Sequence, residues 1–174
     1  MKKSIRRWEI TGIVFIVIAG GALHFVFDLS GGWRPLAVVA AVNESVWEHL
    51  KLGFWPALIY FFIEYRFIMK SKNIMFAKAS GILLIPVTIT VLFYLYTGFI
   101  EDMLAIDLII FVLAVVIGQL VSYRILVLRA LPSWLNKLGM IILILLVVAF
   151  STLTYFAPEL PIFEDPVGGG YGLQ

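Results

Sequence analysis

The stretch LGMIILILLVVAFSTLTYF, residues 138–156, contains no charged residue and is long enough to cross a lipid bilayer as a helix. It lacks the alternation of apolar and polar residues that a lipid-facing barrel strand needs, so a helix is expected. Four other stretches have the same character. Together they predict an all-α bundle of five transmembrane helices at Trp8–Phe27, Leu52–Met69, Gly81–Phe99, Leu104–Tyr123 and Leu138–Phe156.

The composition also favours lipid as the surrounding medium. Of the 174 residues, 62% are hydrophobic, whereas a soluble domain is nearer half apolar. We expect a single transmembrane domain over residues 1–157, followed by a Pro- and Gly-rich tail over 158–174. The absence of cysteine excludes disulfides, thiol catalysis and thiolate metal sites. The net charge of +2 gives no indication of a nucleic-acid partner.

The basic residues predict the orientation of the bundle. On the five-span model, only Arg34 and Lys51 of the 13 lysines and arginines lie on one side. Because basic residues concentrate on the cytoplasmic side, the N-terminus is predicted to be cytoplasmic and the tail extracytoplasmic, in a cell membrane. The other basic residues all lie on the predicted cytoplasmic side: Lys2, Lys3, Arg6, Arg7, Arg66, Lys70, Lys72, Lys78, Arg124, Arg129 and Lys137.

One apolar segment between the first two spans is too short to cross. Leu36–Val42 is therefore expected to be a re-entrant or interfacial piece that protein covers.

Acidic residues and both histidines gather on the side opposite to the basic residues. Only Glu9 and Glu64 lie near the inner side, where we expect Glu64 to snorkel to the surface or to pair with Arg66. Lys70, Lys72 and Lys78 could attract anionic lipid on that side. The outer groups are His24, Asp28, Glu44, Glu48, His49, Glu101, Asp102, Asp107, Glu159, Glu164 and Asp165. The outer face is thus the place to look for function.

The segment NESVWEHLK, residues 43–51, directly precedes the second span and is dense in functional groups. Ser45 and Glu48 match a capping box, in which Ser45 caps the helix and Glu48 returns to the Ser45 amide. One interpretation is a well-capped helix and nothing more. A cap does not, however, require Asn43, Glu44 and His49 as well.

The end of the first span adds two more groups to this segment. His24 and Asp28 share one helix face, and the connection brings them near residues 43–49. Carboxylates with imidazole suit a divalent metal such as zinc or manganese, and also acid–base catalysis. We therefore expect metal ligands at His24, Asp28, Glu44, Glu48 and His49, a catalytic pair in Glu48 and His49, and ligand-binding groups in Asn43, Glu44 and Asp107, with Asn43 orienting a ligand or a loop carbonyl.

The tail offers a second pattern on the same face. Phe163 and Tyr171 are expected to pack over the outer ends of the helices, with Glu164 and Asp165 meeting Arg34 or Lys51. A flexible terminus is the alternative.

Residues 43–51 and the tail PIFEDPVGGGYG at 161–172 resemble the motifs of a small uncharacterised bacterial family of multipass membrane proteins, and the resemblance covers the whole chain. It implies that loop and tail belong together, and it implies no activity. A more distant similarity is to membrane hydrolases of the alkaline ceramidase and progestin-receptor type. Those carry a zinc site of Ser, Asp and three His across seven helices, whereas this chain has two histidines.

Two classes of function remain open. One is a metal-assisted hydrolase acting on a lipid or another outer-leaflet substrate. The other is a non-enzymatic binding or transport component for a cation, a proton or a small polar molecule, similar in size to the substrate-binding subunits of vitamin importers. A transport path requires polar residues through the bilayer, and the sequence suggests few beyond Thr88, Thr90, Gln119 and Ser122.

Overall fold

A computed structural model describes residues 2–173 and contains five long α-helices. They are α1 (Lys2–Leu29), α2 (Val46–Ile68), α3 (Ile74–Thr97), α4 (Leu104–Leu126) and α5 (Ser133–Thr152). Two short 3-10 helices, η1 (Arg34–Val38) and η2 (Pro161–Phe163), lie outside them. The prediction of an all-α protein is confirmed over the described residues.

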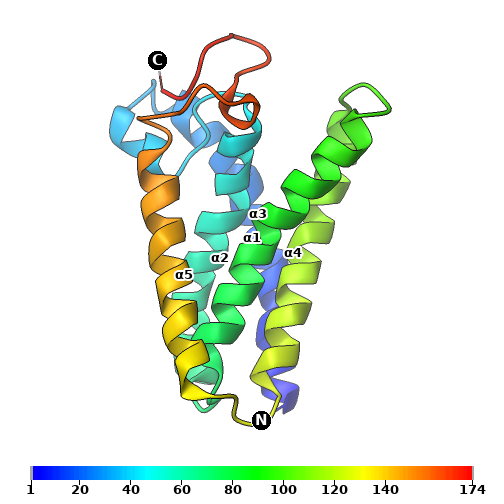
Figure 1. The fold of residues 1–174 in the computed structure, drawn as a ribbon, viewed down its shortest axis with the longest axis vertical. Coiled ribbons are helices and arrows are strands. Elements are labelled where there is room, and N and C mark those ends of the chain that lie inside the picture. Colours follow the sequence, from blue (N-terminus) through cyan, green and yellow to red (C-terminus); the bar gives the residue numbers. More distant parts are fainter. Residues whose placement is uncertain (1, 174) are drawn as a thin grey trace.

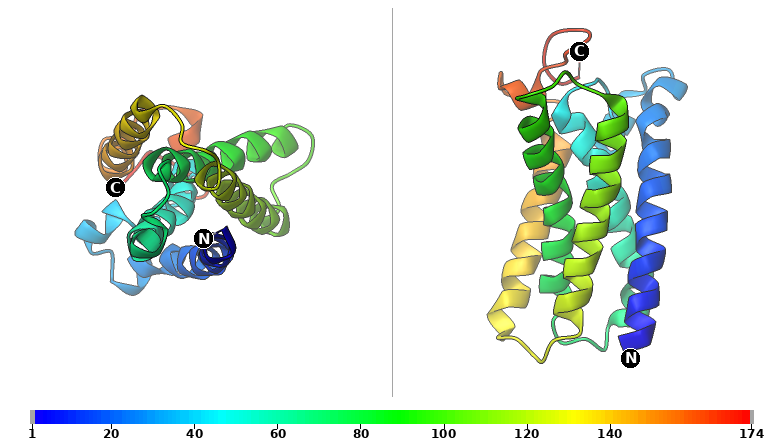
Figure 2. Two further views of the ribbon diagram at one scale, coloured as in Figure 1. Left: turned by 90° about the horizontal axis from the view of Figure 1, so that it is seen from below. Right: turned by 90° about the vertical axis from the view of Figure 1, so that its right-hand side faces the viewer.

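The five helices run side by side along the long axis of the molecule (Figures 1 and 2). The chain starts at one end, and the C-terminal tail, η1 and the α3–α4 connection lie at the other, which we call the tail end (Figure 1). The α2–α3 and α4–α5 connections lie at the N-terminal end. Each of the five long helices therefore has one terminus at the tail end, where the residues predicted to lie on the outer face are found.

Four helices within residues 2–173 are long and apolar enough to cross a membrane, namely α1, α3, α4 and α5. Their outward faces carry large exposed apolar side chains such as Ile18, Ile109 and Leu145. A soluble monomer rarely exposes apolar surface on this scale, so lipid is the expected neighbour.

Helix α2 is the one predicted span that is not among the helices apolar enough to cross a membrane. Its charged residues lower its apolar character, and it buries more residues than any other helix. Glu48, Lys51 and Glu64 are each 1% exposed or less. These three charges of α2 thus face protein, whereas Arg66 in its last turn is exposed.

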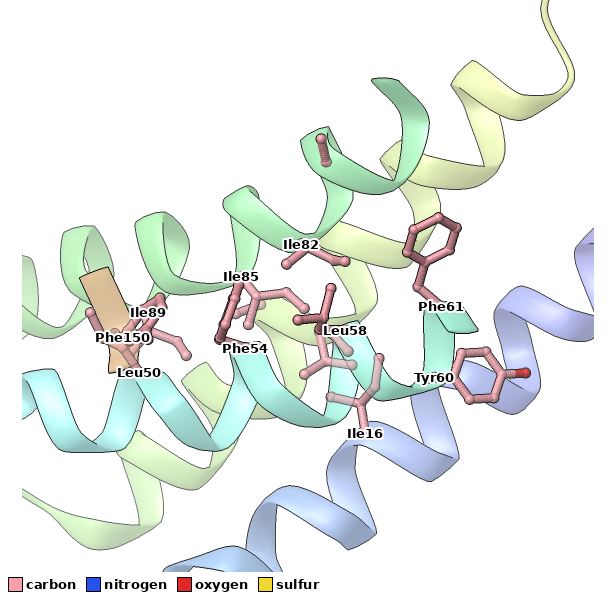
Figure 3. Close-up of a cluster of buried hydrophobic side chains, with 14 of the residues drawn as sticks. Ile16, Leu50, Phe54, Leu58, Tyr60, Phe61, Ile82, Ile85, Ile89 and Phe150 are labelled. Carbon is pink, nitrogen blue, oxygen red and sulfur yellow. The ribbon is translucent and has the colours of Figure 1, made fainter. Parts of the chain in front are cut away.

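The core forms where α2 meets its neighbours (Figure 3). Phe54 and Leu58 of α2 pack with Ile85 of α3 and Ile16 of α1, and Phe150 of α5 stacks on Phe54 with ring centroids 4.5 Å apart. These side chains fix the rotation of α2 in the bundle. That rotation decides which polar groups of α2 are buried.

Helices α3 and α4 approach each other closely through two glycines. A methyl group on Gly118 would come within 2.6 Å of the Gly81 carbonyl oxygen, and one on Gly81 within 2.7 Å of the Gly118 carbonyl oxygen. Small residues at crossings of membrane helices permit this contact between backbones.

The segment before α2 is also close-packed: Ala37, Ala40 and Ala41 are buried, which agrees with the expectation that protein covers residues 36–42.

Candidate metal centre

The start of α2 is set by Ser45, as the capping pattern predicts. The Glu48 amide donates to Ser45 Oγ at 3.4 Å. The reciprocal half of the capping box is wrong, because the Ser45 amide donates to Asn43 Oδ1 at 3.0 Å instead. The Glu48 carboxylate is thereby free to bond elsewhere.

The Glu48 carboxylate is fully occupied inside the protein. Its Oε2 lies 2.5 Å from Lys51 Nζ and accepts from the Val42 amide at 3.1 Å, while Oε1 accepts from the Thr154 hydroxyl at 2.7 Å. Lys51 also donates to the Ala37 carbonyl at 2.7 Å and to Thr154 at 2.9 Å. This network ties α2 to the segment before it and to the end of α5.

The expectation that Glu48 is a metal ligand is therefore corrected. Lys51 supplies the positive charge next to Glu48, and both carboxylate oxygens have protein partners. The i, i+3 spacing of Glu48 and Lys51 was the signal for this pair, since the two lie on one helix face. Glu48 holds the segment in place rather than reaching a ligand.

Three predicted ligands do come together at the tail end. His24 comes from α1, Glu44 from the turn before α2, and His49 from the first turn of α2. Glu44 lies 3.9 Å from His24 Nε2 and 3.4 Å from His49 Nε2, and one ligand atom of each residue lies within 4.8 Å of the others. The side chains are half-buried, with exposed fractions of 30% for His24, 37% for His49 and 49% for Glu44.

The hydrogen bonds of His49 prepare its Nε2 for a ligand. His49 Nδ1 lies 2.9 Å from the Ser45 carbonyl oxygen, which can only accept, so Nδ1 carries the proton. Nε2, which lies 3.4 Å from Glu44, is then the ring nitrogen available to a ligand. A backbone carbonyl that fixes the tautomer in this way is typical of metal-binding histidines.

Asp28 and Asp107 are placed differently from these three. Asp28 is exposed and lies outside the group of three, so the five-residue convergence reduces to His24, Glu44 and His49. Asp107 is near enough to interact electrostatically with His49. It belongs to a second cluster, in which the Tyr96 hydroxyl lies 2.6 Å from Asp107 Oδ1 and 2.7 Å from Asp102 Oδ1. No pattern in the sequence indicated a role for Tyr96.

The tail packs on this end of the bundle. Asn43 Nδ2 donates to the Gly172 carbonyl at 3.0 Å, a contact that joins the segment before α2 to the tail. A role of Asn43 toward a ligand stays a prediction. Phe163 is buried and packs on Trp47 at 4.7 Å between ring centroids, as predicted. The expected ion pair to Lys51 is wrong, because Lys51 is buried against Glu48. Gln174 lies outside the described residues.

A second buried polar group lies nearer the N-terminal end and was not predicted. Lys78 of α3 contacts Glu9 of α1 and Glu64 of α2. Lys78 is 2% exposed and Glu64 1% exposed, so Lys78 is not available to lipid. Glu64 pairs with Lys78 rather than snorkelling or pairing with Arg66, and both of those expectations are wrong. The three residues come from three helices, so no short-range spacing in the sequence predicts their contact.

The chain belongs to a family of unknown function, DUF6512, whose model matches residues 1–173. This agrees with the resemblance to an uncharacterised family over the whole chain; the motif assignment and the bacterial origin remain predictions. Comparisons with curated proteins and with solved structures gave no match.

Proposed function

We propose that the chain binds a divalent metal ion through His24, Glu44 and His49. The observation that carries the proposal is the placement of their three ligand atoms within 4.8 Å of one another. Two imidazoles and one carboxylate form a ligand set of catalytic zinc sites, in which a fourth position stays open for water. The fixed tautomer of His49 adds to the fit.

We further propose that all five long helices span the membrane with the tail end outside. Helix α2 has 23 residues, about 35 Å at 1.5 Å per residue, against a hydrocarbon core of about 30 Å. The excess of basic residues at the N-terminal end supports this orientation. Reporter fusions after Lys72 and Lys137 should report the cytoplasm, and fusions after Glu101 and Gln174 the outside. A cytoplasmic C-terminus contradicts the proposal.

In this orientation the metal centre faces the outer leaflet, and the function it supports best is metal-assisted hydrolysis of a lipid or another substrate there. A bound metal supplies an activated water and polarises the bond to be cut. The half-exposed side chains leave room for a substrate group to approach from the membrane surface. Asp107, next to His49, is suited to orient the substrate or the water.

Metal binding is tested first, on purified protein titrated with zinc. Wild type should retain about one zinc per chain, as a three-ligand site does. Glu44→Gln, His24→Ala and His49→Ala should each weaken binding at least tenfold. Asp28→Asn is the matched control: it removes a neighbouring carboxylate outside the group of three and should bind as wild type does. Equal binding by wild type and Glu44→Gln contradicts the site.

Hydrolysis is then measured with zinc-loaded protein in mixed phospholipid micelles. Release of fatty acid or head group by wild type, lost in Glu44→Gln, supports the hydrolase. Stoichiometric zinc with no turnover on any lipid class argues instead for the binding or transport component. A specific observation favours that second candidate: the buried charges of Glu9, Lys78 and Glu64 provide polar groups deep in the bundle that a transport path requires.

A further inference from the structure

Glu9, Lys78 and Glu64 form a buried cluster in which two carboxylates share one ammonium group. Lys78 Nζ lies 2.6 Å from Glu9 Oε1 and also contacts Glu64 Oε1. The exposed fractions are 3% for Glu9, 2% for Lys78 and 1% for Glu64. Three helices thus bring three charges together away from water.

The bonding of the two carboxylates is incomplete. The Ser122 hydroxyl of α4 donates to Glu9 Oε1 at 3.1 Å, the same oxygen that Lys78 contacts. Glu9 Oε2 and Glu64 Oε2 are buried and have no hydrogen-bond partner among residues 2–173. A buried carboxylate oxygen without a donor is costly when the group is ionised.

The charges of the cluster do not balance either. Two ionised carboxylates and one ammonium leave an excess of one negative charge. The other polar groups facing it supply no cation: Tyr60 of α2 donates its hydroxyl to the Trp8 carbonyl at 2.6 Å, and α4 contributes the neutral Ser122. Among residues 2–173, Tyr60 is the only titratable group besides Lys78 that interacts electrostatically with both Glu9 and Glu64. One added positive charge would balance the site.

We propose that this cluster is a proton-binding site that holds one proton on the Glu9–Glu64 pair. A proton from water converts one carboxylate to a carboxylic acid, which removes the excess charge and turns an unpartnered oxygen into an O–H donor. The remaining carboxylate keeps its ion pair with Lys78.

The donor set distinguishes a proton from a metal ion. Calcium takes about six to eight oxygen ligands, and magnesium keeps several waters beside one or two carboxylates. Only two carboxylate oxygens of this cluster are unpartnered among residues 2–173, the cluster is buried, and the Lys78 ammonium at 2.6 Å from Glu9 repels a second cation. A proton requires a single oxygen and tolerates this neighbour.

The site does not depend on the metal centre. It is built from α1, α2, α3 and α4 and contains none of His24, Glu44 and His49. Loss of zinc binding therefore leaves this proposal untouched, and its test needs neither metal nor substrate.

Infrared spectroscopy of the purified protein at pH 7 measures the proton directly. A protonated carboxylic acid absorbs separately from carboxylates, and its band should shift when the glutamates are labelled with 13C. Wild type should show one such glutamic-acid band per chain. Glu9→Gln and Glu64→Gln should each lose it, because each leaves one carboxylate paired with Lys78. Glu159→Gln, an exposed control, should keep it.

The labelled wild-type spectrum decides the matter even where a variant fails to fold. Absence of a 13C-sensitive carboxylic-acid band at pH 7 overturns the proposal. So does a band that persists in both Glu9→Gln and Glu64→Gln. A band that appears only when sodium is removed assigns the cluster to sodium instead and equally contradicts a resident proton.

Discussion

Two buried ion-pair clusters stand in this bundle, and they differ in how completely they are satisfied. At the tail end, Glu48 and Lys51 balance in charge, and both oxygens of Glu48 have partners. Nearer the N-terminal end, two carboxylates share Lys78, and one oxygen of each has no hydrogen-bond partner among the residues that the structure describes. Burial of charge alone therefore does not indicate function. The complete cluster holds α2 in place, and the incomplete one is where we propose a bound proton.

Disrupting the complete cluster should cause the largest loss of stability. Lys51→Met leaves Glu48 buried without its cation, and we expect the free energy of unfolding to fall by about 3–5 kcal/mol. Unfolding in mixed detergent micelles measures it. Lys70→Met, at an exposed lysine, is the control and should change stability by less than about 0.5 kcal/mol. Equal stability of the two variants would show that the Glu48–Lys51 pair is not structural.

The packing of the tail next to this cluster gives the second effect. Phe163 is 5% exposed and lies on Trp47, so Phe163→Ala should cost about 3 kcal/mol, the lower end for a buried aromatic ring. Proteolysis should also remove the tail faster. Val167→Ala, at a residue 80% exposed, should leave both measurements unchanged. A tail that is cleaved equally fast in wild type and Phe163→Ala is not packed on the bundle.

The α3–α4 crossing tests whether the helices that carry Lys78 and Ser122 are fixed in place. Gly118→Val drives a side chain into the backbone of Gly81 and should cost about 1–3 kcal/mol. Gly21→Val makes a matched control in α1, because a side chain there meets open space. If the control destabilises the bundle as much as Gly118→Val does, helix propensity rather than the close crossing explains the result.

The smallest expected effect is that of Glu64→Gln, which is compared with Glu48→Gln. Glu64→Gln leaves Glu9 and Lys78 balanced, so stability should change by about 1 kcal/mol or less. Glu48→Gln leaves Lys51 buried without a counterion and should cost about 3 kcal/mol or more. The two stability losses thus show whether a carboxylate is needed to balance its lysine, as expected for Glu48, or is in excess, as expected for the Glu9–Glu64 pair. Equal losses in the two variants would mean that the clusters do not differ.

Much of the fold follows from hydropathy. Each predicted span overlaps one of α1 to α5, although α1, α2, α3 and α5 begin five to seven residues earlier than predicted. The Ser45 cap follows from local spacing. The meeting of His24 with His49 was also predictable, because the connection from α1 returns to the same end of the bundle.

The buried pairs were harder to predict for a physical reason. Helices α3 and α4 are apolar on nearly all faces, so their sequences do not reveal which face meets a neighbour. Lys78 therefore looks like any basic residue near a helix end until the rotation of α3 is known. Positional rules place charges at a depth in the membrane, but only packing assigns their partners.

X-ray absorption at the zinc edge of the loaded wild-type protein identifies the ligands of the proposed metal centre. We predict a first shell with two imidazole nitrogens at about 2.0 Å and carboxylate or water oxygen, and no other protein ligand type. Glu44→Gln should lose the carboxylate signal or the metal, and Asp28→Asn should give the wild-type spectrum. A shell of water oxygens alone, or one with a single imidazole, would contradict the site formed by His24, Glu44 and His49.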